Sequence, residues 1–330
     1  MIFGFVSRMP NQNRNTRIRL ADFTVSMATR LKYQEALQGL TDWMGSAEND
    51  FCNEDDLICA FVQYLYEEMR PKNAGLLVVA AVQDKYPGVA LVRAKRLLGA
   101  WEKLEPPARA FPLPAVGCCL IIVNWLESSL DEKSKLQLAC TALLLFTCLM
   151  RPHEVRRIKK SDFSRFSRGF TLALSPEQSK TGKRHNRMEI VSITDPVTVF
   201  FLDLLFASLN SDDLLSPWST AHGFASFVER VSDDFPFIPR ITPYSFKRGG
   251  ATHLFSIFRS YDPIVQLGRW SSVNSARLYI DDAFGALGRM RLSPRETAKC
   301  ERARQFLADL VRLNGGVGRG ADESFLLKNP

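Results

Sequence analysis

Residues 267–280 of the chain read LGRWSSVNSARLYI, and in this segment Tyr279 follows Trp270 by nine residues. Apolar residues recur here at helical spacing, which predicts one helix up to about residue 267 and a second that contains Tyr279 near its end. A tyrosine in such a place is most often an amphipathic core residue. The segment therefore has to be interpreted together with the segments that precede it in the chain.

The helical segment at residues 242–254 reads TPYSFKRGGATHL. Tyr244 and Lys247 stand three residues apart, so on a helix they share one face. Gly249 and Gly250 inside a helical pattern cost about 1 kcal/mol each relative to alanine. We therefore expect close packing, or close approach of another backbone segment, at these two glycines.

Two segments further upstream carry candidate functional side chains. Arg151 precedes Pro152 and Glu154, which is typical of a helix start, with proline in the first turn and an acidic side chain favourable to the helix dipole. Residues 177–184, EQSKTGKR, contain Lys180 close to a glycine in a polar turn. A lysine in such a turn can swing into a substrate groove and donate a proton, although a solvated turn lysine is the more common case.

Strand-like alternation surrounds that polar turn. Phe170–Leu174 alternates clearly, and Arg187–Ile193 alternates more weakly, with Met188 and Ile190 on one face. This pattern predicts a hairpin or a small three-stranded sheet with a basic tip. Two further basic side chains belong to the tip: Lys183 and Arg184.

The chain is expected to contain four parts. Residues 1–18 form a flexible basic arm, residues 19–104 an all-α domain, residues 105–113 a proline-rich linker, and residues 114–330 a second domain. Helices in the first domain are expected at about 26–44, 54–69, 73–85 and 88–103. Helices in the second are expected at about 114–129, 134–149, 195–208, 223–231, 243–258, 261–267, 272–281 and 294–313. The fold class is therefore mainly α with a small β-sheet.

Composition and charge narrow the class of protein further. A length of 330 residues fits two domains of about 150 residues each, and 46% hydrophobic residues are ordinary for a globular protein. The net charge is +8, and the forty residues 151–190 alone carry eleven Lys and Arg against four Asp and Glu. Such a concentration suggests an anionic partner, with nucleic acid the leading candidate and a solvated basic face the alternative.

Several other classes are not expected. The longest charge-free apolar runs, residues 110–126 and 136–150, are shorter than the roughly 20 residues that span a bilayer, and residues 1–20 show no secretory signal. The seven cysteines include no C-x-x-C pair, and the four histidines show no ligand spacing with carboxylates. We expect an intracellular protein without disulfides, a metal, another cofactor or a membrane anchor.

Taken in order, these segments resemble the tyrosine recombinases, or phage-type integrases. The catalytic domain of that family carries Arg-x-x-Glu, a hairpin Lys, His-x-x-Arg, then Gly-His or Gly-x-Trp, and a Tyr about nine residues after that His or Trp. The matching positions in chain order are Arg151 with Glu154, Lys180, Tyr244 with Lys247, Trp270, and Tyr279. The family also has an all-α core-binding domain, a linker and an α+β catalytic domain, so the resemblance covers nearly the whole chain after the arm.

The resemblance implies a site-specific recombinase or mobile-element integrase that breaks and rejoins double-stranded DNA through a 3′-phosphotyrosine intermediate. Tyr279 would be the nucleophile, Arg151 would clamp the phosphate and Glu154 would orient Arg151. Lys180 would protonate the departing 5′-oxygen, and Trp270 would pack and hydrogen-bond where many relatives have histidine. A covalent phosphoenzyme conserves the bond energy, and cationic groups offset charge on the phosphate oxygens.

DNA contacts outside the catalytic positions are also expected. They fall on the hairpin tip and on the end of the fourth helix of the first domain, at Lys183, Arg184, Arg93, Lys95 and Arg96. The resemblance further implies a homo-oligomer, a tetramer on two DNA sites, in whichever compartment holds the DNA.

The chain departs from the family pattern at one motif, where Tyr244-x-x-Lys247 stands in place of His-x-x-Arg. Lysine keeps the charge but lacks the bidentate fork of arginine, and tyrosine, with a pKa near 10, is a poor proton shuttle at pH 7. Arg248 is a candidate substitute, although it sits about 100° round the helix from Lys247. Two alternatives remain beside the recombinase: a non-cleaving DNA-binding protein on the same fold, and a type IB topoisomerase-like enzyme.

The last helical pattern, residues 294–313, is amphipathic. Its apolar stripe consists of Ala298, Ala303, Phe306, Leu307, Leu310 and Val311. In relatives a C-terminal helix packs on a neighbouring protomer. The stripe is therefore expected either to meet a second protomer or to close the core of its own domain.

Overall fold

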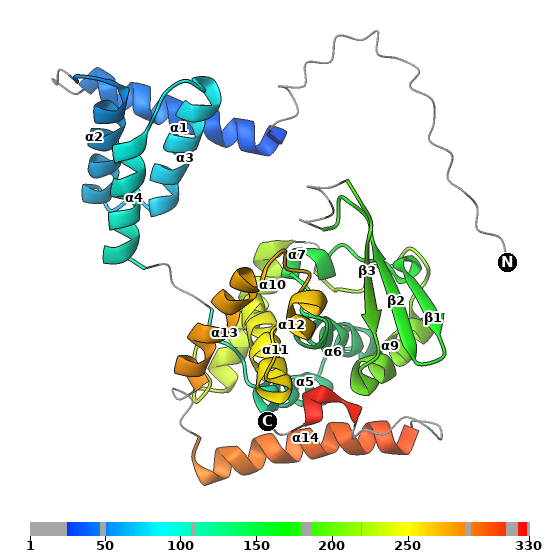
Figure 1. Cartoon of the computed structure of the whole chain (residues 1–330). Coiled ribbons are helices and arrows are strands. Elements are labelled where there is room, and N and C mark those ends of the chain that lie inside the picture. The colour runs from blue at the N-terminus through cyan, green and yellow to red at the C-terminus, as the bar shows by residue number, and fades with distance from the viewer. Residues whose placement is uncertain are drawn as a thin grey trace, which may run out of the picture. The chain divides into compact units, whose positions relative to one another are not determined.

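The computed structural model describes residues 25–46, 51–106, 110–179, 182, 186–218, 220–287, 292–314 and 323–328, with the backbone alone for 281–287. The chain divides into two compact units, residues 1–108 and 109–330, each described here by itself (Figure 1). The arm at residues 1–18 and three of the expected site residues lie outside the described residues: Lys180, Lys183 and Arg184.

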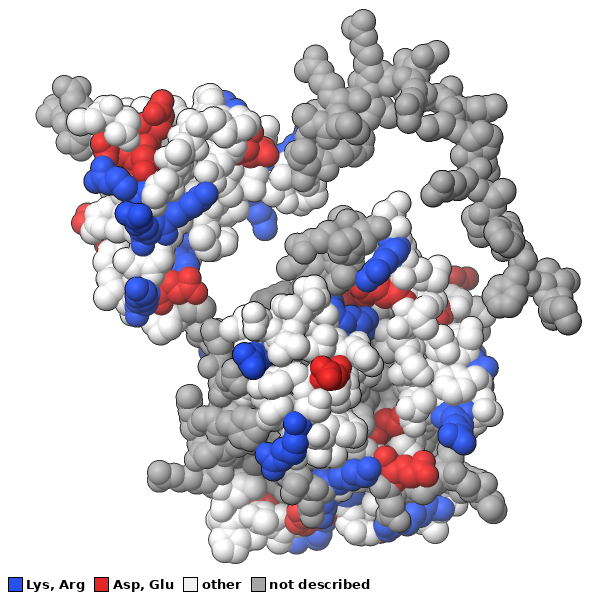
Figure 2. Space-filling view, viewed as in Figure 1, with Lys and Arg blue, Asp and Glu red and all other residues white. Residues whose placement is uncertain are grey.

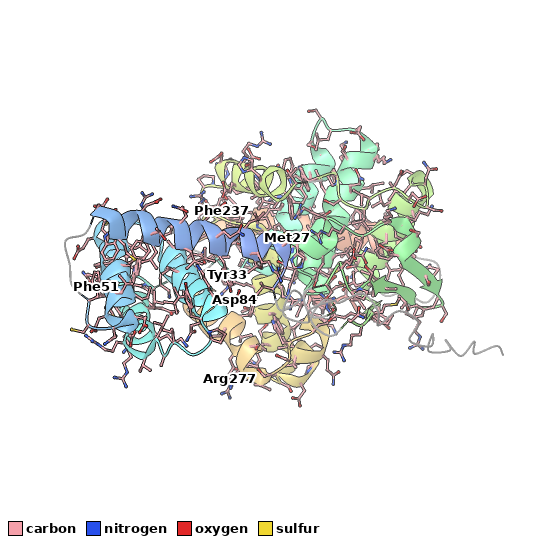
Figure 3. The ribbon with its side chains drawn as sticks, turned by 90° about the horizontal axis from the view of Figure 1, so that it is seen from above. Met27, Tyr33, Phe51, Asp84, Phe237 and Arg277 are labelled. Carbon is pink, nitrogen blue, oxygen red and sulfur yellow. The ribbon has the colours of Figure 1, made fainter. Side chains whose placement is uncertain are left out.

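The N-terminal unit consists of helices in its described part. They are α1 (Met27–Ser46), α2 (Glu54–Glu67), α3 (Lys72–Lys85) and α4 (Val92–Leu104), each within a few residues of its expected range. Their apolar faces meet in one core, which includes Ile58, Val62, Val78, Leu98 and Trp101. Phe51, labelled in Figure 3, continues this core just after α1, with its ring centroid 5.9 Å from that of Trp43.

Asp55 fixes the start of α4 against α2. Its carboxylate accepts hydrogen bonds from the backbone N–H groups of Arg93 and Ala94, at 2.8 and 2.9 Å. An acidic side chain that satisfies free N–H groups at a helix start is favourable to the helix dipole. The contact therefore fixes the first turn of α4, which carries basic side chains.

The C-terminal unit is built around two strongly buried helices of its own, α5 (Ala115–Glu127) and α6 (Glu132–Thr147). Its other helices are α7 (Pro152–Val155), α9 (Pro196–Ser208), α10 (Ala221–Asp234), α11 (Pro243–Phe258), α12 (Asp262–Gly268), α13 (Val273–Leu287) and α14 (Pro294–Asn314), with 3-10 turns η2 (Lys160–Asp162) and η4 (Phe325–Leu327). Every residue from Gln137 to Thr147 of α6 is buried. A helix that is apolar nearly all round belongs inside a core.

A three-stranded antiparallel sheet lies at one side of this core, with α9 between it and α6 (Figure 1). Its strands β1 (Phe163–Phe166), β2 (Gly169–Leu174) and β3 (Glu189–Ile193) pair in the order β1-β2-β3. Of the two expected forms, a hairpin or a three-stranded sheet, the second is present. Strand β1 was not assigned from the sequence, because its four residues FSRF are too few to show a period.

The inward face of β3 differs from the expected one. Met188 and Ile190 do share a face, but they are 60% and 59% exposed. The buried residues are Val191, Ile193 and, unexpectedly, the acidic Glu189. A carboxylate turns inward only where cations or donors meet it, so this residue belongs with the site described below.

Helix α11 confirms the close approach expected at its two glycines. A Cβ added at Gly249 would lie 1.8 Å from the carbonyl oxygen of Leu113, and one added at Gly250 would lie 2.0 Å from that of Phe146. Any side chain would push α11 away from the chain segment before α5 and from the end of α6. The two glycines therefore allow α11 to sit deep in the unit.

Helix α14 packs on α5 and α9 of its own unit. The residues that it buries there are Cys300, Ala303, Leu307, Ala308 and Val311. Of the expected stripe, Ala298 is exposed and Phe306 is 42% exposed. The structure thus places the apolar stripe of α14 in the core of its own domain, which was one of the two expected arrangements. The buried face of the helix differs slightly from the expected one, because it includes Cys300 and Ala308 in place of Ala298 and Phe306.

Candidate functional site

Lys247 lies at the centre of the candidate site. It projects from the first turns of α11 and is fully buried, with Nζ 4.7 Å from the ring centroid of Trp270 and 6.0 Å from that of Tyr279. Nζ also donates a long hydrogen bond, 3.5 Å, to the carbonyl oxygen of Gly268. A cation over aromatic faces is attracted by their quadrupoles, which offsets part of the loss of water.

The surroundings of Lys247 disfavour its charged form. Burial holds the pKa of the Lys247 ammonium well below its usual 10.5, and the charges of Arg151 and Arg269 lower it further. Glu154 and Glu189 act in the opposite direction. Two arginines, two carboxylates and one lysine therefore interact electrostatically in one buried region.

Arg151 and Glu154 form the second part of the site. Arg151 caps the start of α7, where its backbone N–H donates to Glu154 Oε2 and its Nη1 donates to Glu154 Oε1, both at 2.8 Å. Pro152 at the first helical position presets the helix, because its missing N–H would be unpaired there anyway. The Arg-Pro-x-Glu order thus places a carboxylate directly against the guanidinium that precedes it.

Glu154 is fully buried and stays ionised. Burial raises the pKa of its carboxyl group, but the Arg269 charge, the Arg151 backbone N–H and the Arg151 charge together bring the pKa below its usual 4.5. A buried carboxylate with two guanidinium partners is a rigid anchor for both.

Arg269 is a member of the site that the sequence did not reveal. Its Nη2 pairs with Glu154 Oε2, and its Nε lies 3.3 Å from Glu189 Oε2. The side chain is 10% exposed, and the residue ends α12 with φ at 54°. This left-handed conformation costs a non-glycine residue about 1–2 kcal/mol, so the ion pairs hold it in place.

Trp270 and Tyr279 complete the site on the other side of Lys247. Their rings lie against each other, with centroids 4.9 Å apart. The Trp270 ring also covers Gly268, where an added Cβ would lie 2.2 Å from a ring carbon. Tyr279 is half-buried on α13, directly before the fully buried Ile280.

Tyr244 and Arg248 stand at the edges of this group. Tyr244 is 44% exposed, whereas Lys247 is buried, so the two occupy the rim and the interior of the same helix face. Partial burial and the nearby Tyr279 raise the pKa of the Tyr244 phenol above 10, which leaves it neutral at pH 7. Arg248 is buried, with its guanidinium carbon 5.8 Å from the ring centroid of Tyr279.

The base of the β2–β3 hairpin is tied to Arg269 through Glu189. Ser179 is buried, and its Oγ donates to Glu189 Oε2 at 2.5 Å. The same Oγ accepts a hydrogen bond from the backbone N–H of Gly182 at 3.2 Å. The described ends of the hairpin tip are therefore fixed, although Lys180, Lys183 and Arg184 themselves lie outside the described residues.

The expected DNA-binding side chains of the N-terminal unit are exposed on α4: Arg93, Lys95 and Arg96. They lie in the first two turns of α4 rather than at its end, because the helix begins at Val92 and not at about residue 88. Arg93 forms an ion pair with Asp56. On the face in Figure 2, basic side chains of this unit lie beside acidic ones. Part of the basic charge on this unit is thus balanced within the unit itself.

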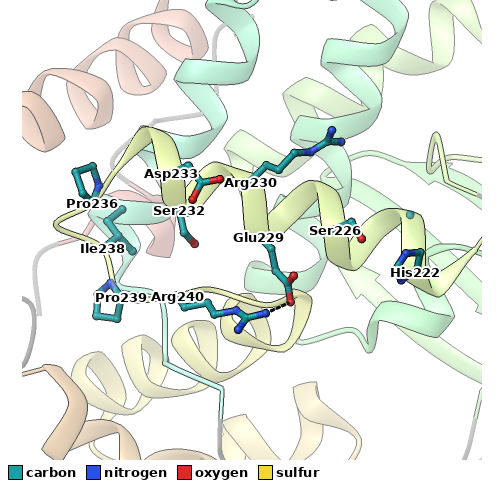
Figure 4. A pocket seen from close by; sticks show the side chains of 11 residues that line it. His222, Ser226, Glu229, Arg230, Ser232, Asp233, Pro236, Ile238, Pro239 and Arg240 are labelled. Atoms are coloured by element: carbon teal, nitrogen blue, oxygen red, sulfur yellow. Dashed lines mark ion pairs between the residues drawn. The ribbon is translucent and has the colours of Figure 1, made fainter.

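Other features of the described residues lie apart from this site. A surface pocket on α10 and the following loop is lined by His222, Ser226, Glu229 and Arg240, with an ion pair of 3.0 Å between the last two (Figure 4). Within the described ranges, His, Cys, Asp and Glu form no group of three or more that suits a metal ion. No described helix is long and apolar enough to cross a membrane.

Comparison with known proteins identifies the fold. No protein-family model and no curated protein sequence matches the chain. Among solved structures, the XerH site-specific recombinase bound to palindromic difH substrate, in a post-cleavage complex, is similar with a TM-score of 0.59 and 13% identity over 78% of this chain and 77% of that one. The Tn1549 transposon integrase in complex with circular intermediate DNA is similar with a TM-score of 0.54 and 13% identity over 80% and 94%. The chain therefore has the tyrosine recombinase fold, mainly α with a small β-sheet.

Proposed function

We propose that the chain binds duplex DNA and breaks and rejoins it through a covalent bond between a DNA 3′-phosphate and Tyr279. One observation supports this most: Tyr279 lies beside a group of three buried or nearly buried basic side chains from separate segments, Arg151, Lys247 and Arg269. A phosphodiester carries negative charge on its non-bridging oxygens and gains more in the transition state. Fixed cations at a dry site are what such a reaction requires.

The proposed cleavage step has a simple balance. The phenol oxygen of Tyr279 forms a bond to phosphorus while its proton passes to water, and the bond from phosphorus to the 5′-oxygen breaks. The departing oxygen keeps the electron pair and takes a proton from Lys180. Attack by a free 5′-hydroxyl on the phosphotyrosine reverses the step and rejoins DNA without an external energy source.

Lys247 is proposed to take the place of the second family arginine. In the protein alone its amine is held toward the neutral form by burial and by two guanidinium groups. A phosphate that enters the site adds negative charge, which raises a lysine pKa and favours the ammonium form. The residue would thus gain its charge when the substrate is present.

Duplex DNA is the proposed ligand, held by both units. Exposed basic side chains are available on α4 and beside the sheet, including Lys95, Arg96, Arg168 and Arg187. Exchange between two DNA sites would bring several copies of the chain together, and a homo-tetramer on two sites is the proposed assembly.

A non-cleaving DNA-binding protein on the same fold is the second candidate. The observation that favours it is the Tyr244–Lys247 motif, in which the tyrosine is a poor proton shuttle at pH 7 and the lysine lacks the bidentate fork of arginine. In that case the cationic site would hold a phosphate without attack by Tyr279.

One experiment separates these functions. DNA that binds the chain would first be selected from a random library. Duplexes with a nick beside each candidate phosphate would then trap any covalent product, which is detected in a denaturing gel. An adduct on Tyr279 supports the enzyme, and binding without an adduct supports the second candidate. Relaxation of supercoiled plasmid without exchange between two sites would instead indicate a topoisomerase-like activity.

A further inference from the structure

Arg269 connects two segments that are far apart in the chain. Through Nη2 it pairs with Glu154 of α7, and through Nε it lies 3.3 Å from Glu189 of β3. Its neighbours in the chain, Gly268 and Trp270, both contact Lys247. One side chain thus lies between the Arg151 clamp and the base of the hairpin.

The two carboxylates depend on Arg269 to different degrees. Glu154 has other partners, because Arg151 gives it both a backbone N–H and a guanidinium nitrogen at 2.8 Å. Among the described residues, the ion pair of Glu189 is with Arg269 alone. Loss of Arg269 would therefore leave Arg151 held but would leave Glu189 buried without its cation, which is strongly unfavourable.

Glu189 in turn fixes the hairpin base. It accepts the hydroxyl hydrogen bond of Ser179 at 2.5 Å, and that hydroxyl also accepts the N–H of Gly182. Ser179 directly precedes Lys180 in the sequence. A chain of three contacts therefore runs from Arg269 to the point where the hairpin tip begins.

We propose that Arg269 is a positioning residue that holds the hairpin base through Glu189 and Ser179, and so aligns the protonation of the leaving 5′-oxygen with the phosphate clamp at Arg151. The inference deepens the proposed function and rests on it. Arg269 itself touches neither the DNA nor the reacting atoms in this role. Arg269 occupies the open position of the Gly-x-Trp motif, which the motif itself leaves unspecified.

The leaving group provides the test. Two nicked duplexes are compared, one with the ordinary 5′-bridging oxygen and one with sulfur at that atom, because a thiolate departs without a proton. For Arg269→Met we expect adduct formation on the oxygen substrate to slow by about 100-fold, as for loss of a general acid. On the sulfur substrate the loss should stay below about tenfold, with DNA affinity within about threefold of wild type.

Controls address a purely structural effect. Arg277 gives a matched variant. It is exposed on α13, with its guanidinium carbon 5.4 Å from the Tyr261 ring centroid, and is labelled in Figure 3. Arg277→Met should leave the rates of adduct formation on both substrates unchanged. If Arg269→Met does not fold, Glu189→Gln removes the negative charge that pairs with Arg269 while keeping the shape of the side chain, and it should show the same selective loss. The double variant Arg269→Met/Glu189→Gln should lose no more than either single change, since all three interrupt one chain of contacts.

The outcomes are distinct. Equal losses on the oxygen and sulfur substrates, in whichever of these variants folds, would overturn the positioning role. Additive losses in the double variant would do the same. If wild-type protein forms no adduct on either substrate, the proposed function itself is wrong and this inference is wrong with it.

Discussion

The indole ring of Trp270 packs on the phenol ring of Tyr279, with the ring centroids 4.9 Å apart and the planes inclined by 43°. The two residues are nine apart in the chain; Trp270 lies in the turn that follows α12, and Tyr279 lies on α13. Their contact, together with the Lys247 ammonium 4.7 Å from the indole centroid, holds Tyr279 beside the cationic group. This relationship leads to the first prediction.

Tyr279→Phe should abolish any covalent protein–DNA adduct while DNA affinity changes by less than about threefold, since one neutral hydroxyl hydrogen bond contributes about 1 kcal/mol. The phenyl ring still packs on Trp270, so the fold is retained. The measurement is adduct formation on a nicked duplex, with affinity taken from a separate binding titration.

Tyr261→Phe is the matched control. Tyr261 lies in the same unit, where its ring contacts Phe255 with centroids 4.7 Å apart, and this variant should form adduct at the wild-type rate. An adduct that persists in Tyr279→Phe would place the nucleophile at another residue.

Lys247→Met should increase the stability of the protein at pH 7 by about 1 kcal/mol or more while removing cleavage. Burial of the Lys247 ammonium group costs free energy because the group loses its water. In the variant that cost is absent, and the two positive charges of the remaining group, on Arg151 and Arg269, equal its two negative charges, on Glu154 and Glu189. The measurement is thermal or denaturant unfolding of both proteins, combined with the adduct assay.

The pH dependence has a definite sign. Because the Lys247 pKa in the folded protein lies well below 10.5, the unfolded state binds the proton more tightly in the window between the two values. Wild-type stability from this group rises with pH through that window, so the advantage of Lys247→Met should shrink toward pH 10.5. Lys159→Met, at an exposed lysine paired with Asp212, is the matched control that removes an ammonium group outside the site. An advantage that grows with pH would contradict the assignment.

Much of the fold could be predicted because its helices obey simple patterns. Helix α11 covers the expected residues 243–258, because Thr242 and Pro243 mark its start and the apolar period continues to Phe258. Helices α5 and α6 follow from continuous apolar runs of the right length. Strand β1 was missed because a four-residue strand with one partly buried residue carries no periodic signal.

The site was predictable only where a motif spans a fixed distance along the chain. Arg151 with Glu154 and Trp270 with Tyr279 are such pairs, and the structure brings each pair together. Arg269 was missed because its partners, Glu154 and Glu189, are distant in sequence, and an arginine after a helix-ending glycine resembles a surface residue. The one available signal was an acidic residue at an inward position of a strand.

DNA binding should depend steeply on salt. With about six phosphate contacts, log K against log salt concentration should have a slope near −5. Arg96→Ala, at an exposed residue without an ion pair to the described residues, should make the slope shallower by about 1. Arg165→Ala should leave it unchanged, because that guanidinium is already bound to Asp203 at 3.1 Å and lies over the Phe170 ring. A slope near zero for wild type would exclude nucleic acid as the main ligand.

Two adjacent residues of α14 separate a core role from an assembly role. Leu307 is fully buried against its own unit, whereas the neighbouring Phe306 is 42% exposed. Leu307→Ala should lower the free energy of unfolding by about 2–5 kcal/mol, because it deletes buried methyl groups and leaves a cavity. Phe306→Ala should change it by less than about 0.5 kcal/mol.

Denaturant unfolding measures the stability of both variants, and a gel-shift assay with two DNA sites measures assembly. If Leu307→Ala left stability intact but prevented two-site complexes, the α14 stripe would be buried against a second protomer, and its place in the core of its own unit would be wrong.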